Sequence, residues 1–163
     1  MSRLDAFIRR MKAQRACIDH VAAQLADQSG PVLELGLGNG RTYDHLRTRF
    51  PDRDIYVFDR EIAAHPECIP PQRLIRLGDF RSTVPVYLAE LRDPAVFIHA
   101  DIGSSDKLAS VGLAADLAPT LARILAPGGY LACDQPVELV GLTLQPLPGG
   151  FEDGRYHLYR RSK

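Results

Sequence analysis

The chain has 163 residues, of which 45% are hydrophobic and 25% charged, and its 20 basic and 20 acidic residues leave no net charge at pH 7. These values exclude disordered and fibrous proteins, and the lack of a basic excess argues against a nucleic-acid partner. No apolar run approaches the roughly 20 residues that span a bilayer, so no membrane partner is expected. We expect one cytoplasmic domain over residues 1–163, with an N-terminal helix in 1–30 and a core in 31–163.

The first 30 residues predict one amphipathic helix over residues 4–28. Apolar side chains recur along it at helical spacing, and Ser29-Gly30-Pro31 ends the pattern. Gln14 and Arg15 interrupt the apolar face. The interruption faces either a ligand cleft, with the helix as a lid, or water.

Strand and helix patterns alternate after residue 30. Apolar runs predict strands over residues 31–35, 54–58, 73–77, 95–100, 130–133, 139–147 and 156–160. Helical spacing predicts helices over residues 42–50, 85–91 and 113–125. Such alternation favours a parallel sheet covered on both faces. Pro148-Gly149-Gly150 suits the turn of a closing hairpin, which would add antiparallel pairing. The segment between the fifth and sixth strands is too short for a helix.

A glycine cluster follows the first strand in the segment Val32 to Gly40, which reads VLELGLGNG. Glycines let a backbone turn sharply and approach a ligand closely, and open parallel sheets bind ligands at the carboxyl ends of their strands. A dinucleotide site needs a third glycine where Arg41 stands. The acidic Glu34 beside the loop would repel a pyrophosphate and attract an ammonium or sulfonium group.

The ordered motifs of the chain resemble those of the class I S-adenosylmethionine-dependent methyltransferases. VLELGLGNG resembles their first motif, DIYVFD their second-strand motif, GDF their third, VFIHAD their fourth, and LAPGGYLACD the entry to their fifth strand. The resemblance covers roughly residues 30–160. It implies an α/β fold, Rossmann-like and doubly wound, with a mostly parallel seven-stranded sheet and a C-terminal antiparallel hairpin.

The resemblance also implies which residues hold the cofactor, S-adenosyl-L-methionine. Asp59 would bind the ribose hydroxyls, Asp79 would face the adenine amine, Phe80 would pack on the base, and Asp101 would lie near the methionine portion. The full expected set is Glu34, Gly36, Gly38, Asn39, Gly40, Asp59, Arg60, Asp79, Phe80 and Asp101. Each acidic residue has a plainer alternative role as a turn former or a salt-bridge partner.

Catalytic residues are harder to assign, because the protein mainly aligns the acceptor with the methyl donor and excludes water. His99 and Asp101 are the candidates, although a buried histidine with satisfied hydrogen bonds is the plainer interpretation of His99. The segment after the fourth strand loosely resembles metal-dependent catechol-type O-methyltransferases, but His99 and Asp134-Gln135 replace two of their three ligands. A magnesium site would not favour imidazole, so no metal is expected.

We therefore predict a methyltransferase that modifies a small molecule at an oxygen or nitrogen atom not determined by the sequence. The alternatives are a protein that binds S-adenosylmethionine without turnover and an NAD-dependent oxidoreductase. A single domain with no cap has an open cleft, so we also predict a homo-oligomer, most simply a twofold dimer. The first helix and the closing hairpin are its candidate contact surfaces.

Overall fold

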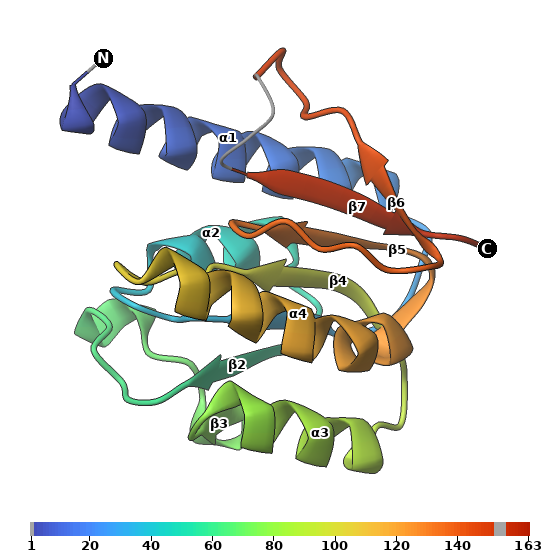
Figure 1. The fold of residues 1–163 in the computed structure, drawn as a ribbon. Helices are drawn as coiled ribbons and strands as arrows, with labels where there is room; N and C mark the ends of the chain where they lie inside the picture. Colours follow the sequence, from blue (N-terminus) through green and yellow to red (C-terminus); the bar gives the residue numbers. More distant parts are fainter. Residues whose placement is uncertain (1, 152–155) are drawn as a thin grey trace.

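The computed structural model of the protein describes residues 2–151 and 156–163. The chain alternates strands and helices up to β5 and then closes with two strands (Figure 1). The elements are α1 (Arg3–Gln24), β1 (Val32–Leu35), α2 (Arg41–Arg49), β2 (Ile55–Asp59), two 3₁₀ turns (Pro66–Cys68 and Gln72–Leu74), β3 (Ile75–Leu77), α3 (Phe80–Glu90), β4 (Ala95–Ala100), α4 (Lys107–Ile124), β5 (Leu125–Cys133), β6 (Leu142–Gln145) and β7 (His157–Arg161).

The strands form one seven-stranded sheet in the order β3-β2-β1-β4-β5-β7-β6. The strands from β1 to β5 pair in parallel, whereas β7 pairs antiparallel with both β5 and β6. The order reverses between β1 and β4, and ligands of such sheets bind at this point, outside the carboxyl ends of the strands. The predicted fold class is confirmed.

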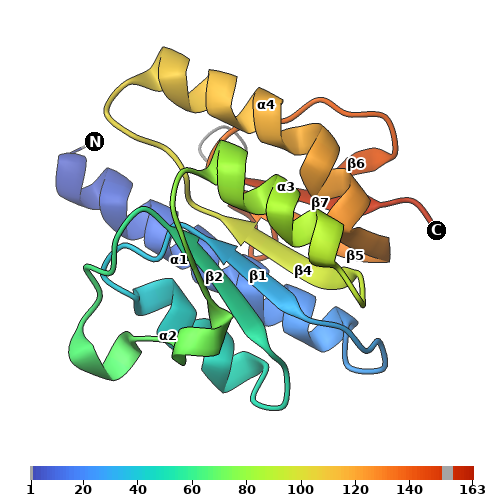
Figure 2. The same ribbon diagram turned by 90° about the horizontal axis from the view of Figure 1, so that it is seen from below.

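Helices cover both faces of the sheet (Figures 1 and 2). One apolar cluster joins α1 and α2 to the sheet and includes Ile18, Leu46 and Phe97. The other joins α3 and α4 to the opposite face and includes Val84 and Leu117. Successive residues of a strand face opposite sides, so the side chains of β4 contribute to both clusters.

Two helices begin earlier than the sequence pattern indicated. The prediction placed the third helix at residues 85–91, but α3 begins at Phe80 and contains Pro85. The Asp79 side chain caps it by accepting from the Arg81 amide at 2.9 Å. Similarly, α4 begins at Lys107, six residues before the predicted start, with Asp106 as its cap. Leu108 in its first turn is exposed, so this part of the helix lacks the apolar spacing on which the prediction depended.

The connection between β5 and β6 has no helix in residues 134–141, as the sequence predicted. In the described ranges, no helix is both long and apolar enough to cross a membrane. The turn predicted at residues 148–150 lies in the connection from β6 to β7, part of which falls outside the described residues.

Candidate functional site

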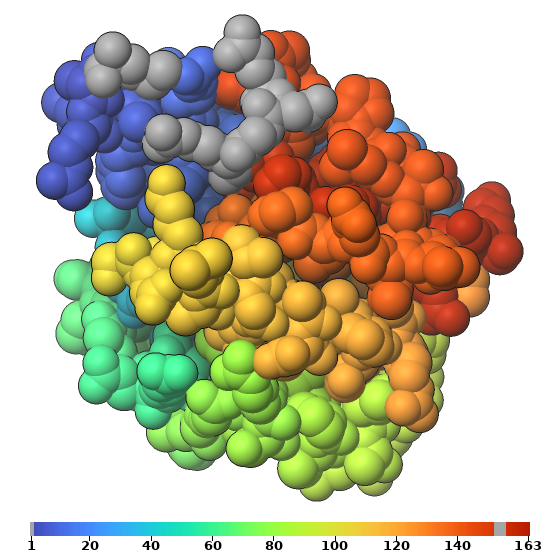
Figure 3. Space-filling view, viewed as in Figure 1, coloured from blue at the N-terminus to red at the C-terminus, as the bar shows by residue number. Residues whose placement is uncertain are grey.

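A cleft of about 700 Å³ lies at the carboxyl ends of β1, β2 and β4. The N-terminal half of α1 forms one wall, and the start of α4 forms another. In the space-filling view, α1 (blue) lies above the segment that enters α4 (yellow) (Figure 3). The lining residues are Phe7, Arg10, Met11, Gln14, Gly36, Leu37, Gly38, Asn39, Arg41, Thr42, Asp59, Arg60, Phe80, Arg81, Asp101, Ile102, Gly103, Ser104, Ala109, Ser110, Gly112 and Leu113.

The three glycines after β1 have different structural roles. A Cβ atom on Gly36 would collide with the carbonyl oxygen of Asp101, so this glycine lets β1 and β4 approach each other. Gly40 has φ +84° at the start of α2, and a Cβ there would lie 2.5 Å from Cys68 Cβ. Gly38 has φ +49°, and a Cβ there would meet nothing within 4 Å. Only Gly38 of the three therefore exposes bare backbone to open space in the cleft.

Asp59 at the end of β2 holds the glycine loop. Its Oδ2 accepts hydrogen bonds from the Leu37 and Gly38 amides at 2.8 and 3.1 Å, and its Oδ1 accepts from the Arg60 amide at 2.6 Å. The Asp59 carboxylate is half-buried; Oδ2 already accepts two hydrogen bonds, and Oδ1 keeps capacity for a further donor. Asp59 therefore fixes the shape of the glycine loop where the loop lines the cleft.

Asp79 lies beside the cleft rather than in its lining. Its carboxylate caps α3 and pairs with Arg60 at 3.2 Å. The Arg81 amide and then the Arg60 guanidinium lower the pKa of Asp79 below its usual value. A carboxylate that caps α3 is ionised at neutral pH, and Phe80 directly after it is buried at the edge of the cleft.

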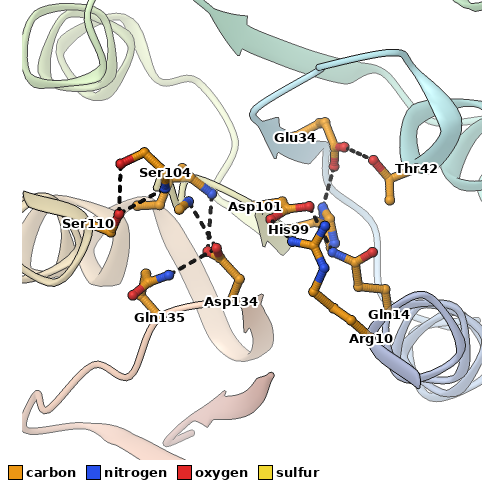
Figure 4. A network of polar contacts seen from close by, with 12 residues as sticks. Arg10, Gln14, Glu34, Thr42, His99, Asp101, Ser104, Ser110, Asp134 and Gln135 are labelled. Atoms are coloured by element: carbon orange, nitrogen blue, oxygen red, sulfur yellow. Dashed lines mark hydrogen bonds and ion pairs between the residues drawn. The ribbon is translucent and has the colours of Figure 1, made fainter. Parts of the chain in front are cut away.

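Asp101 joins the end of β4 to α1 (Figure 4). Its Oδ1 pairs with the Arg10 guanidinium at 3.2 Å, and its Oδ2 accepts from Gln14 Nε2 at 2.9 Å. Gln14 is only 1% exposed, whereas Arg15 faces solvent. Of the two polar residues that interrupt the apolar face of α1, Gln14 thus faces the cleft and Arg15 faces water.

A buried ion pair between neighbouring residues of β1 and β4 lies beneath the cleft. His99 Nδ1 and Glu34 Oε2 are 2.6 Å apart and both side chains are fully buried. Thr42 of α2 donates its hydroxyl proton to the other Glu34 oxygen. Burial alone would lower the pKa of His99, but the carboxylates of Glu34, Asp101 and Asp134 outweigh it and raise the pKa. The pair therefore favours an imidazolium.

Asp134 at the end of β5 is engaged by the backbone that follows β4. It accepts from the amides of Ile102 and Gly103 at 3.1 and 2.9 Å and from Gln135 Nε2 at 3.0 Å. Burial and then the charge of Asp101 raise the pKa of Asp134. No group of three or more His, Cys, Asp or Glu side chains suited to hold a metal ion occurs within residues 2–151 and 156–163.

The predicted site residues fall into two sets. Seven line the cleft: Gly36, Gly38, Asn39, Asp59, Arg60, Phe80 and Asp101. Glu34, Gly40, Asp79 and His99 support the cleft from below or beside it. The prediction missed the cleft residues contributed by α2 and by the segment that opens α4, such as Thr42 and Ser110, for which the sequence carries no motif.

A larger depression of about 1190 Å³ lies at the opposite end of the sheet, lined by Arg53, Asp54, Tyr56 and Arg76 among others. It contains none of the predicted site residues. Two of its arginines are engaged locally, since Arg53 donates to the Gly30 and Leu25 carbonyl oxygens and Arg76 to those of Arg73 and Ile75. The smaller cleft is therefore the candidate site.

Over residues 1–161, the chain matches the model of a family described as S-adenosyl-L-methionine methyltransferase. The chain belongs to this family. It is also 45% identical to an S-adenosyl-L-methionine methyltransferase from Silicibacter pomeroyi, whose crystal structure superimposes with a TM-score of 0.94 over 99% of each chain. This methyltransferase is accordingly an enzyme that uses S-adenosylmethionine, and neither alternative from the sequence is supported.

More distant solved structures share the fold. Human methyltransferase-like protein 13, solved in complex with SAH, is 14% identical with a TM-score of 0.61, over 94% of this chain and 81% of that one. CalS10 from Micromonospora echinaspora, an amino pentose methyltransferase solved with SAM, is 20% identical with a TM-score of 0.54, over 98% and 68%. No protein of curated function matches the chain.

Proposed function

We propose that this methyltransferase modifies a small molecule, which enters the cleft between α1 and the start of α4. The observation that carries the proposal is the wall formed by α1, anchored to the floor through Arg10 and Gln14. Cavities of 300–1,000 Å³ are typical of small-molecule sites, and the cleft of about 700 Å³ falls in this range. After the cofactor is bound, the remaining space suits a small acceptor better than a polymer.

The residues of the cleft fit the cofactor in their shape, their hydrogen-bonding groups and their apolar surface. Open space above Gly38 allows close approach to the loop backbone. The free acceptor site on Asp59 Oδ1 suits a ribose hydroxyl, and Phe80 provides an apolar face for a base. We therefore assign cofactor binding to the cleft members Gly36, Gly38, Asn39, Asp59, Arg60, Phe80 and Asp101, with Glu34, Gly40 and Asp79 in support.

Bound S-adenosylmethionine supplies a methyl group on a positively charged sulfonium, which leaves as a neutral thioether. The chain itself contributes alignment and exclusion of water, since α1 closes one side of the cleft. Asp101 carries negative charge at the junction of the cofactor and acceptor regions, which favours a cationic sulfonium there. His99 is fully buried and is therefore proposed to act through neighbouring groups rather than by touching the acceptor.

Incubation with S-adenosylmethionine carrying a labelled methyl group tests this proposal. A panel of small hydroxyl and amine compounds is compared with protein and RNA from a lysate, and label in a small compound is the expected result. Label only in macromolecules would overturn the proposal. Calorimetry with S-adenosylhomocysteine and with NAD provides the control, because only the first is expected to bind.

A further inference from the structure

Three polar side-chain atoms near Asp101 are buried and have no hydrogen-bond partner among the residues that the structure describes. They are Gln14 Oε1 on α1, His99 Nε2 on β4 and the hydroxyl of Tyr156, the residue before β7. These side chains are 1%, 0% and 2% exposed. Buried polar atoms nearly always have partners, because an unpaired one loses its hydrogen bonds to water without replacement. Three such atoms in one region of the core indicate that they share a polar partner that is not part of the chain.

The three side chains belong to one neighbourhood. The rings of His99 and Tyr156 have centroids 6.1 Å apart. Gln14 donates to Asp101, and the charge of Asp101 acts on both His99 and Tyr156. All three lie on the face of the sheet covered by α1, directly below the cleft. Figure 4 shows Gln14 and His99 approaching Asp101 from different elements.

The hydrogen-bond inventory of these atoms matches one molecule of water. Glu34 as a carboxylate can only accept, so His99 Nδ1 carries the hydrogen of their 2.6 Å contact. In neutral His99, Nε2 and Gln14 Oε1 then need two donors, and the Tyr156 hydroxyl needs one acceptor. A water molecule donates twice and accepts the Tyr156 proton. When His99 is protonated, the same water accepts from Nε2 instead.

We propose that Gln14, His99 and Tyr156 bind one buried water molecule, and that this water connects the Glu34–His99 pair to the Asp101 end of the cleft. Because Gln14 also donates to Asp101, the water links the buried pair to the residue that anchors α1 over the cleft.

The titratable groups that face the site come from α1, β1, β4, β5 and the residue before β7. Glu34 on β1, Asp101 at the end of β4 and Asp134 at the end of β5 all favour protonated His99. Burial raises the pKa of the Cys17 thiol on α1 to about 12 and that of Cys133 on β5 still further. Tyr156 is likewise buried with its pKa raised, so these three groups are uncharged at neutral pH.

Tyr156→Phe tests the site in the protein without cofactor or acceptor, because it removes only the hydroxyl. Tyr130→Phe is the matched control, since Tyr130 is also buried, at 4% exposed, and its ring lies within β5 against His20 rather than His99. The readouts are the melting temperature and the titration of the His99 ring by NMR, assigned with His99→Gln. A high-resolution crystal structure locates the water directly.

If the water is present, Tyr156→Phe lowers the melting temperature by about 2–4 °C. It also lowers the pKa of His99 by about half to one unit, because the imidazolium loses a stronger, charge-assisted bond than the neutral ring does. Tyr130→Phe leaves the His99 titration unchanged. A higher melting temperature with an unchanged titration would mean that the Tyr156 hydroxyl is unpaired and would overturn the proposal. Because no ligand is used, these results do not depend on whether the acceptor is a small molecule.

Discussion

Gln14 of the first helix donates a hydrogen bond to Asp101 at the end of β4, across 2.9 Å and 87 positions of sequence. The second oxygen of the same carboxylate receives Arg10, so one side chain holds two successive turns of α1 over the cleft. The apolar anchors of α1, such as Ile18 and Val21, lie in its C-terminal half. Asp101 thus determines how firmly the N-terminal half of α1 is held over the cleft.

Asp101→Ala is expected to loosen the N-terminal half of α1 without unfolding the core. Arg10 and Gln14 both lose their acceptor. The ion pair between Arg10 and Asp101 is partly exposed and contributes only about 0–1 kcal/mol to stability, because water screens it. Hydrogen exchange at the amides of residues 6–14 should accelerate, while exchange in β1 and β4 stays slow. Asp116→Ala, which breaks an exposed pair between α4 and Arg81, is the control and should leave α1 unchanged.

Gly38→Ala is expected to abolish cofactor binding in a folded protein. The left-handed backbone costs roughly 1–2 kcal/mol for a residue with a side chain, but the new Cβ meets no protein atom and projects into the cleft. Gly36→Ala forces a collision with the Asp101 backbone and should cost about 3 kcal/mol or more of stability. Circular dichroism and calorimetry with S-adenosylhomocysteine separate the two effects. Normal affinity in a folded Gly38→Ala protein would place the ligand elsewhere.

The sequence predicted the sheet and most of the cleft floor because both depend on local patterns. Apolar runs followed by glycine or an acid mark strand ends, and strand ends meet at one edge of a parallel sheet. The early starts of α3 and α4 were missed because capping by Asp79 and Asp106 precedes any apolar periodicity. Gln14 was identified as an interruption of the apolar face of α1, but only the structure shows that its side chain faces the cleft and not water.

The Glu34–His99 pair and Tyr156 were not predictable as a group. Glu34 was expected to face the cofactor, yet pairing between β1 and β4 brings it beside His99. That contact depends on strand order and register, which a single sequence does not report residue by residue. Tyr156 carries no motif, and it joins the group only because β7 returns antiparallel next to β5.

Asp59→Ala is expected to weaken binding of S-adenosylhomocysteine by about 10- to 100-fold. The change removes a charged acceptor of ligand hydroxyls, and it also frees the amides of Leu37 and Gly38 that shape the loop. Asp54→Ala serves as the control, because Asp54 lies just before the other end of β2 in an exposed pair with Arg73. An unchanged dissociation constant for Asp59→Ala would remove Asp59 from the proposed site.

The twofold dimer remains a prediction, with a weaker basis than before. It was derived from an uncovered cleft, and α1 supplies part of that cover. The exposed apolar side chains of α1, among them Leu4 at 66% and Phe7 at 43%, still offer a contact surface. Light scattering at micromolar concentration should show twice the mass of one chain. A species of 18.0 kDa would contradict the dimer.

Stability is expected to fall as pH rises through the raised pKa of His99. A histidine whose folded pKa exceeds its unfolded value of about 6.5 contributes fully below that pH, because both states are then protonated. Above it, the folded state holds the proton more tightly than the unfolded state, so the contribution is lost until the folded pKa is passed. Glu34→Gln removes the first cause that raises this pKa and should flatten the decline.

The measurement is the unfolding free energy from denaturant titrations between about pH 6 and about pH 9. The difference between wild type and His99→Gln isolates the buried pair from other titrating groups. His45→Gln, which breaks the more exposed pair with Asp19, is the surface control. A wild-type slope that His99→Gln leaves unchanged would show that His99 has no raised pKa in the folded protein.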